Sequence, residues 1–210
     1  MKIGIIGSGM IGGTAARLFA RAGHEVAISN SRGREAVAGI AREIGMNAHA
    51  MEAEQAAAFG DIVLLAIPLH AFNKLPPGWL QGKIAIDAMN YYPDRDGRID
   101  ALDSGRSTSS ELVAQHFPGA RVVKAFNTIY YKNLAARGDA KQPVADRFAI
   151  FVAGDDPEAK ALVTGLIEEL GFAPVDTGSL REGGRKQQPG SPIYNQVMTG
   201  REGAEAQKGI

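Results

Sequence analysis

The chain has 210 residues, of which 45% are hydrophobic, and its 23 basic side chains balance 23 acidic ones. This composition supports one folded domain with a sizeable core, and the balanced charge argues against nucleic acid as a partner. The sequence has no cysteine, which excludes disulfides, thiolate nucleophiles and cysteine metal sites.

The N-terminal residues run directly into an apolar stretch, Ile3 to Ile6, without the charged lead or cleavage site of a signal peptide. The longest strongly apolar run, Ile62 to Leu69, is too short to span a bilayer. We therefore expect a cytoplasmic protein with no membrane partner.

Strand and helix patterns alternate along the chain. In chain order they predict strand Lys2–Ile6, helix Ile11–Ala22, strand Glu25–Ser29, helix Arg34–Ile44, a weak strand Ala48–Ala50, helix Glu52–Phe59, strand Asp61–Ile67, strand Lys83–Asp87, a helix from Thr108 to about Phe117, strand Arg121–Phe126, strand Arg147–Ala153, a helix from Asp156 to near Leu170, and strand Phe172–Asp176. The helix from Thr108 begins with capping-box spacing, and Asp156-Pro157 supplies an N-cap and an N1 proline.

This alternation predicts an α/β fold, a Rossmann-type doubly wound and mostly parallel sheet covered on both sides. Residues 1–176 would form this domain. From Thr177 onward the sequence is richer in glycine and polar residues. We expect residues 177–210 to be a short C-terminal extension, a loop or tail that covers the site or a partner subunit.

The first strand leads into a glycine loop that fits G-x-G-x-x-G and opens a helix, as dinucleotide binding requires. Gly7 permits the tight turn, Gly9 lets the backbone approach a pyrophosphate, and Gly12 lets helix and strand pack closely. The helix N-terminus offers free N–H groups to phosphates. Glycines also mark ordinary turns, but the position favours a cofactor. The expected contacts are Gly7, Ser8, Gly9, Met10, Ile11 and Gly12.

The turn after the second strand lacks the carboxylate that holds the adenosine ribose in NAD sites. Ser31 can donate a hydrogen bond, and Arg32 can make a forked contact with phosphate oxygens or stack on adenine, with Arg34 within reach. The alternative is that both arginines are solvated loop charges. The pattern predicts NADP(H) as the cofactor.

Several stretches together resemble the NADPH-dependent reductase family typified by the NADP oxidoreductase of the deazaflavin coenzyme factor 420. The resemblance covers roughly residues 2 to 180 and is carried by SNSRG, AIPLHAF, GKIAIDAMNYY, ELVAQHFPGARVVKAFNT, FVAGDDPEAK and LGFAPVDTGSL. Its N-terminal motifs are shared with the nucleotide-binding part of ferric reductases. The resemblance implies a Rossmann-type domain with a small C-terminal extension, usually dimeric, and direct hydride transfer between NADPH and a deazaflavin ring. We expect a homodimer.

In a doubly wound sheet, ligands bind beyond the C-terminal ends of the strands. The resemblance places Ala66, Ile67 and Pro68 against the ribose and nicotinamide, with Asn90 and Asn127 bordering the hydride-transfer space. Phe126 could pack on a flat ring or close the strand as a core residue. Asn127 could cap the next segment or face a ligand. The expected acceptor-binding residues are Phe126, Asn127 and Thr128.

His70 is the only histidine near a strand end, and it could serve catalysis, contact the cofactor or lie on the surface. We assign it to cofactor binding and name no catalytic residue. No metal site is expected, because the four histidines are scattered.

Hydride exchange between two rings needs juxtaposed faces and little acid–base chemistry. We therefore predict an NADPH-dependent oxidoreductase with a small-molecule ring acceptor, a deazaflavin or a flavin. The Tyr130-Tyr131 pair leaves carbonyl or imine reduction open, since that chemistry needs a proton donor. A non-enzymatic NADP(H)-binding sensor or partner protein is the other alternative.

Overall fold

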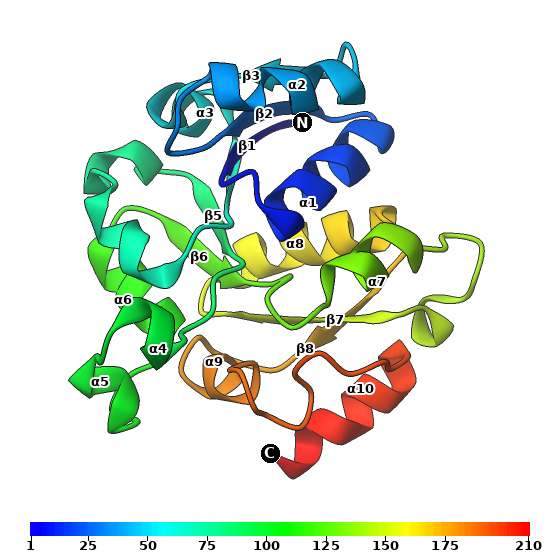
Figure 1. Ribbon diagram of the computed structural model, residues 1–210. Helices are drawn as coiled ribbons and strands as arrows, with labels where there is room; N and C mark the ends of the chain where they lie inside the picture. The colour runs from blue at the N-terminus through cyan, green and yellow to red at the C-terminus, as the bar shows by residue number, and fades with distance from the viewer.

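The computed structural model describes residues 1–210 as one eight-stranded sheet with helices on both faces (Figure 1). The strand order is β3-β2-β1-β4-β5-β6-β7-β8. The strands are β1 (Lys2–Ile6), β2 (Glu25–Ser29), β3 (Ala48–Ala50), β4 (Ile62–Leu65), β5 (Ile84–Asp87), β6 (Arg121–Lys124), β7 (Ala149–Gly154) and β8 (Ala173–Asp176). The predicted Rossmann-type architecture is confirmed.

Strands β1 to β6 are mutually parallel, whereas β7 pairs antiparallel with β6 and parallel with β8. The chain therefore runs through β7 in the direction opposite to β6. The C-terminal ends of β1, β4, β5 and β6 consequently share one edge, where the order reverses between β1 and β4.

Ten α-helices accompany the sheet, and several are shorter than the sequence predicts. They are α1 (Met10–Arg21), α2 (Glu35–Ile44), α3 (Ala53–Phe59), α4 (Pro93–Asp96), α5 (Asp100–Asp103), α6 (Ser109–His116), α7 (Tyr131–Ala136), α8 (Pro157–Glu169), α9 (Glu182–Lys186) and α10 (Gly200–Ala206). Four 3₁₀ helices join them: η1 (Leu69–Lys74), η2 (Pro77–Leu80), η3 (Val144–Asp146) and η4 (Gln207–Gly209). No helix is both long and apolar enough to cross a membrane.

Two apolar clusters lie on opposite faces of the sheet. The larger one packs side chains of α1, α2, α7 and α8 against the strands, with Phe19 and Phe126 near its centre. The smaller one packs α3, α6 and the 3₁₀ turns against the other face. Burial on both faces explains why β4 is apolar throughout and why β5 is apolar up to its last residue, Asp87.

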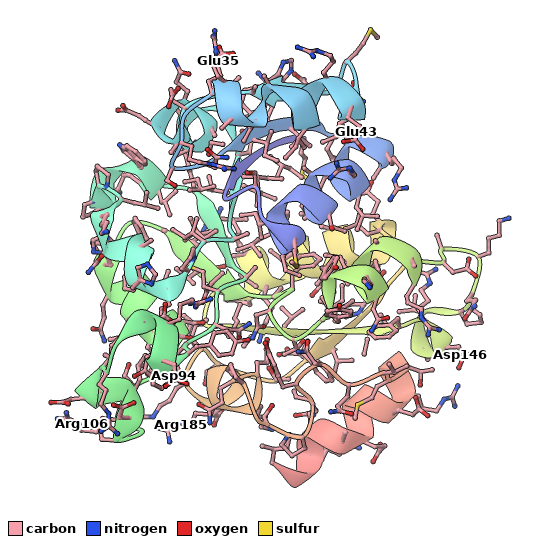
Figure 2. All side chains as sticks on the ribbon, in the orientation of Figure 1. Glu35, Glu43, Asp94, Arg106, Asp146 and Arg185 are labelled. Carbon is pink, nitrogen blue, oxygen red and sulfur yellow. The ribbon has the colours of Figure 1, made fainter.

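The C-terminal segment carries two helices where the sequence predicts a tail or loop. Ile193 is buried with Phe151 and Val175 in a third apolar cluster, so the segment packs on β7 and β8 (Figure 1). Thr108 Oγ1 donates to the carbonyl of Leu180 at 3.0 Å, which joins the segment to the start of α6. Figure 2 shows Arg185 of α9 at the same end of the molecule as Arg106, while Glu35 extends outward from α2.

Candidate cofactor and acceptor site

The glycine loop has the geometry that phosphate binding requires. Gly7 has a φ of 113°, and a Cβ added there would overlap the carbonyl of Ala66. A Cβ on Gly12 would overlap the carbonyl of Gly7, so the close packing of helix on strand depends on this glycine. A Cβ on Gly9 would meet nothing within 4 Å. The α1 N-terminus has no side-chain cap and no acidic residue in its first turn, which leaves its N–H groups free.

A short hydrogen-bond chain ties the turn after β2 to the glycine loop. Asn30 Nδ2 donates to Ser8 Oγ at 2.9 Å, and Asn30 Oδ1 accepts from the Arg32 N–H at 2.8 Å. Ser31, Arg32 and Arg34 are all exposed. The Arg32 guanidinium has no ion-pair partner, whereas Arg34 lies 3.6 Å from Glu35. Arg32 is therefore the cation of this turn that is free to bind a phosphate.

The Glu52 side chain holds this turn from the other side, a contact that the sequence did not predict. Its Oε1 accepts from the Arg34 N–H at 2.8 Å. Glu52 is also the N-cap residue of α3, where it forms a capping box with Gln55. The carboxylate is thus engaged with backbone and is placed to fix the turn.

We expect Arg32→Glu to weaken NADPH binding about ten- to a hundred-fold, or about 1.5–3 kcal/mol, through loss of a charged hydrogen bond. NADH affinity should change far less, because NADH has no 2′-phosphate. Arg42→Glu makes the same charge change at the far end of α2 and serves as the control. Calorimetric titration with both nucleotides checks this; equal weakening of both would show that Arg32 does not contact the 2′-phosphate.

A cleft of ≈ 420 Å³ opens beside the glycine loop at the C-terminal ends of β4, β5 and β6. Eleven of its sixteen lining residues are hydrophobic. The lining is Met10, Ile11, Ala66, Ile67, Pro68, Ala88, Met89, Asn90, Tyr92, Arg95, Asn127, Ile129, Tyr130, Tyr131, Tyr194 and Asn195. It contains no carboxylate, histidine or lysine.

Buried amides form one wall of the cleft. Asn127 Nδ2 donates to Asn90 Oδ1 at 3.0 Å and to the carbonyl of Gln187 at 2.8 Å. Asn90 Nδ2 donates to the Asn127 carbonyl at 2.9 Å. Asn127 Oδ1 is buried without a partner in the protein. These bonds join the ends of β5 and β6 to the C-terminal segment.

A buried ion pair lies beneath the cleft. Lys124 Nζ is 3.3 Å from Asp87 Oδ2 and donates to the Met89 carbonyl at 3.1 Å, while Asp87 Oδ1 accepts from the Met89 N–H at 2.9 Å. Ser110 Oγ donates to Asp87 Oδ2 at 2.5 Å. Both Lys124 and Asp87 are almost fully buried. The pair therefore binds both backbone polar groups of Met89, a residue that lines the cleft.

Asp96 organises the outer rim of the cleft. Arg95 donates to both of its oxygens, at 2.9 and 2.8 Å, and the His70 ring nitrogen Nδ1 lies 2.8 Å from Oδ1. Burial acts to raise the pKa of Asp96, but the hydrogen bonds from Arg95, the Tyr92 backbone and His70 outweigh it and hold the pKa well below its usual range. Asp96 is thus a fixed anion that orients Arg95 and His70.

Three of the predicted site residues lie away from the cleft. Phe126 is expected among the acceptor-binding residues, but the structure places it in the core instead. Its φ is 64°, its ring packs edge-on against that of Phe19 with the centroids 6.2 Å apart, and it is fully buried. Thr128 is 3% exposed and is absent from the lining. His70 is bound to Asp96 outside the lining. Their predicted ligand contacts are therefore not supported by their positions.

The other predicted cleft residues come together, namely Met10, Ile11, Ala66, Ile67, Pro68, Asn90 and Asn127. Sequence reasoning missed Tyr92 and Arg95, although both follow a strand end that it did consider. It also missed Tyr194 and Asn195, which reach the cleft through long-range folding. No group of three His, Cys, Asp or Glu side chains is arranged for a metal ion.

The family model described as NADP oxidoreductase coenzyme F420-dependent matches residues 2–91. The match includes the glycine loop, the Arg32 turn and the ends of β4 and β5. The resemblance inferred from the sequence is therefore confirmed over these residues. Over these residues the chain is similar to the NADP oxidoreductases of that family.

Solved structures extend the similarity to the whole chain. A hypothetical protein from Sinorhizobium meliloti is 34% identical, with a TM-score of 0.82 over 95% of both chains. A protein described as an F420-dependent NADP reductase, from Arthrobacter sp. FB24, is 26% identical, with a TM-score of 0.70 over 86% of both chains. The chain therefore shares its fold over nearly its whole length with the Sinorhizobium protein.

Curated relatives are longer proteins. Metalloreductase STEAP3 of Rattus norvegicus is 30% identical over 181 residues, which are 85% of this chain and 34% of the rat protein. Metalloreductase STEAP2 of Homo sapiens is 25% identical over 187 residues, 86% of this chain and 34% of the human protein. The chain spans about a third of the length of the curated relatives it matches.

Proposed function

We propose that the chain transfers a hydride from NADPH to a planar ring acceptor, a deazaflavin or a flavin, bound in the cleft beside the glycine loop. The lining of the cleft carries this proposal, because it is mostly apolar and its only titratable side chains are tyrosines and one arginine. Such a lining suits two stacked rings, whose reaction depends on juxtaposition and exclusion of water.

The residues present fit the cofactor. The free α1 N-terminus and the open space at Gly9 suit a pyrophosphate, and the unpaired Arg32 suits a 2′-phosphate. Bound NADPH would supply the hydride. Ala66, Ile67 and Pro68 would then line the passage from the pyrophosphate to the cleft, with Asn90 and Asn127 on its far wall. The description of the Arthrobacter protein supports a deazaflavin as the acceptor.

Residues 177–210 contribute to the same site in this proposal. Tyr194 and Asn195 line the cleft, and the Asn195 N–H donates to the Thr128 carbonyl at 2.8 Å. We infer that this segment covers the acceptor ring while residues 1–176 bind NADP(H). A homodimer stays a prediction, which light scattering on the purified protein checks.

Turnover of NADPH against a panel of acceptors tests the proposal. The panel should contain an 8-hydroxy-5-deazaflavin, riboflavin, a quinone and a small ketone with an amine. Reduction of a ring acceptor well above the others supports the proposal. Tight NADPH binding without turnover of any acceptor would favour a sensor, and preferred reduction of the ketone or imine would favour carbonyl or imine chemistry.

Direct transfer makes a further prediction about two tyrosines of the cleft lining, and about His70 outside it. His70→Gln, or Tyr130→Phe with Tyr131→Phe, should change the rate several-fold at most, against the 10²–10⁴ expected for loss of a general acid. Asn127→Leu should do more harm, because displacing the rings by about an ångström spoils their approach. The measurement is single-turnover oxidation of NADPH deuterated at the transferred position.

Thermal unfolding of each variant provides the folding control, and NADPH affinity is measured alongside. A thousand-fold loss in the His70 or tyrosine variants, with NADPH affinity unchanged, would contradict direct transfer.

A further inference from the structure

Four hydrogen-bonded polar side chains form a row from the interior to the cleft: Asn127, Asn90, Tyr194 and Tyr92. The donor and the acceptor of each hydrogen bond in this row can be assigned. The row begins at Asn127, whose amide nitrogen faces the backbone carbonyl of Gln187 at 2.8 Å. A carbonyl can only accept, so the nitrogen of the Asn127 side chain must occupy this position. The same nitrogen then donates to Asn90, which must present its Oδ1 at 3.0 Å.

The orientation of Asn90 follows from that contact. Its Nδ2 faces the backbone carbonyl of Asn127 at 2.9 Å and the hydroxyl of Tyr194 at 3.4 Å. Because an amide nitrogen only donates, the Tyr194 oxygen accepts here. Two backbone carbonyls thus fix the direction of the row as far as Tyr194.

The next hydrogen bond of the row joins the hydroxyls of Tyr194 and Tyr92. Burial raises the pKa of Tyr194 well above its usual range, and its hydrogen bond with Tyr92 adds to the rise, while a side-chain hydrogen bond from Asn195 opposes it. Tyr194 therefore keeps its proton, and its oxygen accepts from the Asn90 amide. Either hydroxyl of the Tyr92–Tyr194 pair could donate in their hydrogen bond. Because Tyr194 is the less exposed of the two, we assign its O–H as the donor, which leaves the unpaired O–H on the exposed Tyr92.

Tyr92 is the last member of the row and lines the cleft. Its oxygen accepts from Tyr194, and no protein group accepts its own proton. The side chain is 36% exposed, and the Arg95 guanidinium lies 4.9 Å from the ring centroid. Arg95 is itself clamped by Asp96 and donates to the Asn90 carbonyl at 2.7 Å. The ring of Tyr92 is thus held in place while its O–H remains available to a ligand.

We propose that Tyr92 donates a hydrogen bond to the oxygen or nitrogen of the acceptor ring that becomes negative when the ring is reduced. This inference rests on the proposed function. In that reaction a C–H bond of the NADPH nicotinamide breaks and its hydride, with two electrons, forms a new bond to the acceptor ring. NADPH is oxidised to NADP⁺, and the reduced ring carries the negative charge until water supplies a proton. Tyr92 keeps its proton throughout and stabilises the charge.

The test compares the two redox forms of the acceptor, since a donor to developing charge must bind the reduced ring more strongly than the oxidised one. The probes are riboflavin and 8-hydroxy-5-deazariboflavin, whose affinities are measured anaerobically in both forms, without turnover. Tyr92→Phe should weaken binding of the reduced ring about tenfold and of the oxidised ring by less than about twofold. The expected loss is below the 10²–10³ of an enclosed oxyanion donor, because Tyr92 is partly exposed.

Single-turnover hydride transfer by Tyr92→Phe should fall by the same factor of about ten. Tyr91→Phe is the matched control: Tyr91 precedes Tyr92 in the chain but is absent from the cleft lining, its hydroxyl donates to Asp103 at 2.8 Å, and its loss should leave both affinities unchanged. Tyr194→Phe should lower the affinity for the reduced ring by less than Tyr92→Phe does. In this variant Tyr92 keeps its O–H but loses the hydrogen bond from Tyr194 that orients it.

Equal weakening of both redox forms by Tyr92→Phe, or no weakening of either, would overturn the inference and leave the proposed function standing. Failure of the wild-type protein to reduce either ring would overturn the proposed function, and the inference with it.

Discussion

Gly9→Val should abolish NADPH binding while the protein stays folded. A branched side chain at this position occupies the space through which the pyrophosphate must approach the loop, so the affinity should fall more than about a hundred-fold, on the order of 3 kcal/mol. The fold should tolerate the change for two reasons. A Cβ at Gly9 meets nothing within 4 Å, and its φ of −70° and ψ of −163° are extended values that valine adopts readily.

Two other glycines provide the controls for this experiment. Gly165→Val, on α8, also points into open space and should leave NADPH affinity unchanged. Gly12→Val, in contrast, forces its Cβ onto the Gly7 carbonyl and should destabilise the protein itself. Circular dichroism and thermal unfolding identify the folded variants, and nucleotide titration follows. Wild-type NADPH affinity in a folded Gly9→Val protein would show that the glycine loop does not bind the cofactor.

The parts of the site that sequence reasoning located are those set by local patterns. The glycine loop, the Arg32 turn and the polar residues after β5 each follow directly on a strand whose apolar run is evident in the sequence. Since parallel strands end at one edge, these segments had to come together. Tyr92 belongs to the same group, because it lies two residues after Asn90, and the strand-end rule would have reached it.

Other features depend on contacts between distant residues and leave no local signal. Phe126 follows an apolar strand, yet its positive φ turns the ring toward Phe19 on α1, a partner that strand periodicity does not specify. The direction of β7 is likewise absent from its apolar pattern, which is the same for parallel and antiparallel pairing. Tyr194 lies in a polar segment and reaches the cleft only because Ile193 is buried against β7 and β8.

Lys124→Met should cost about 3–5 kcal/mol of unfolding free energy, because it leaves the Asp87 carboxylate buried without its cation. Lys124 is 1% exposed and the Asp87 side chain is fully buried, so solvent does not replace the lost partner. The Met89 carbonyl also loses its donor at 3.1 Å. Chemical denaturation measures the change, and Lys160→Met is the matched control, since its pair with Asp176 is partly exposed and should contribute less than about 1 kcal/mol.

The double variant Lys124→Met with Asp87→Asn separates the buried charge from the packing. The amide oxygen can still accept from the Met89 N–H at 2.9 Å, and no charge remains in the interior, so more than half of the lost stability should return. A Lys124→Met protein no less stable than Lys160→Met would show that the pair is unimportant for the fold. Because the pair binds both backbone polar groups of Met89, its loss should also make this part of the cleft lining less rigid. NADPH affinity of the double variant, measured at a temperature where it is fully folded, isolates that second effect from global unfolding.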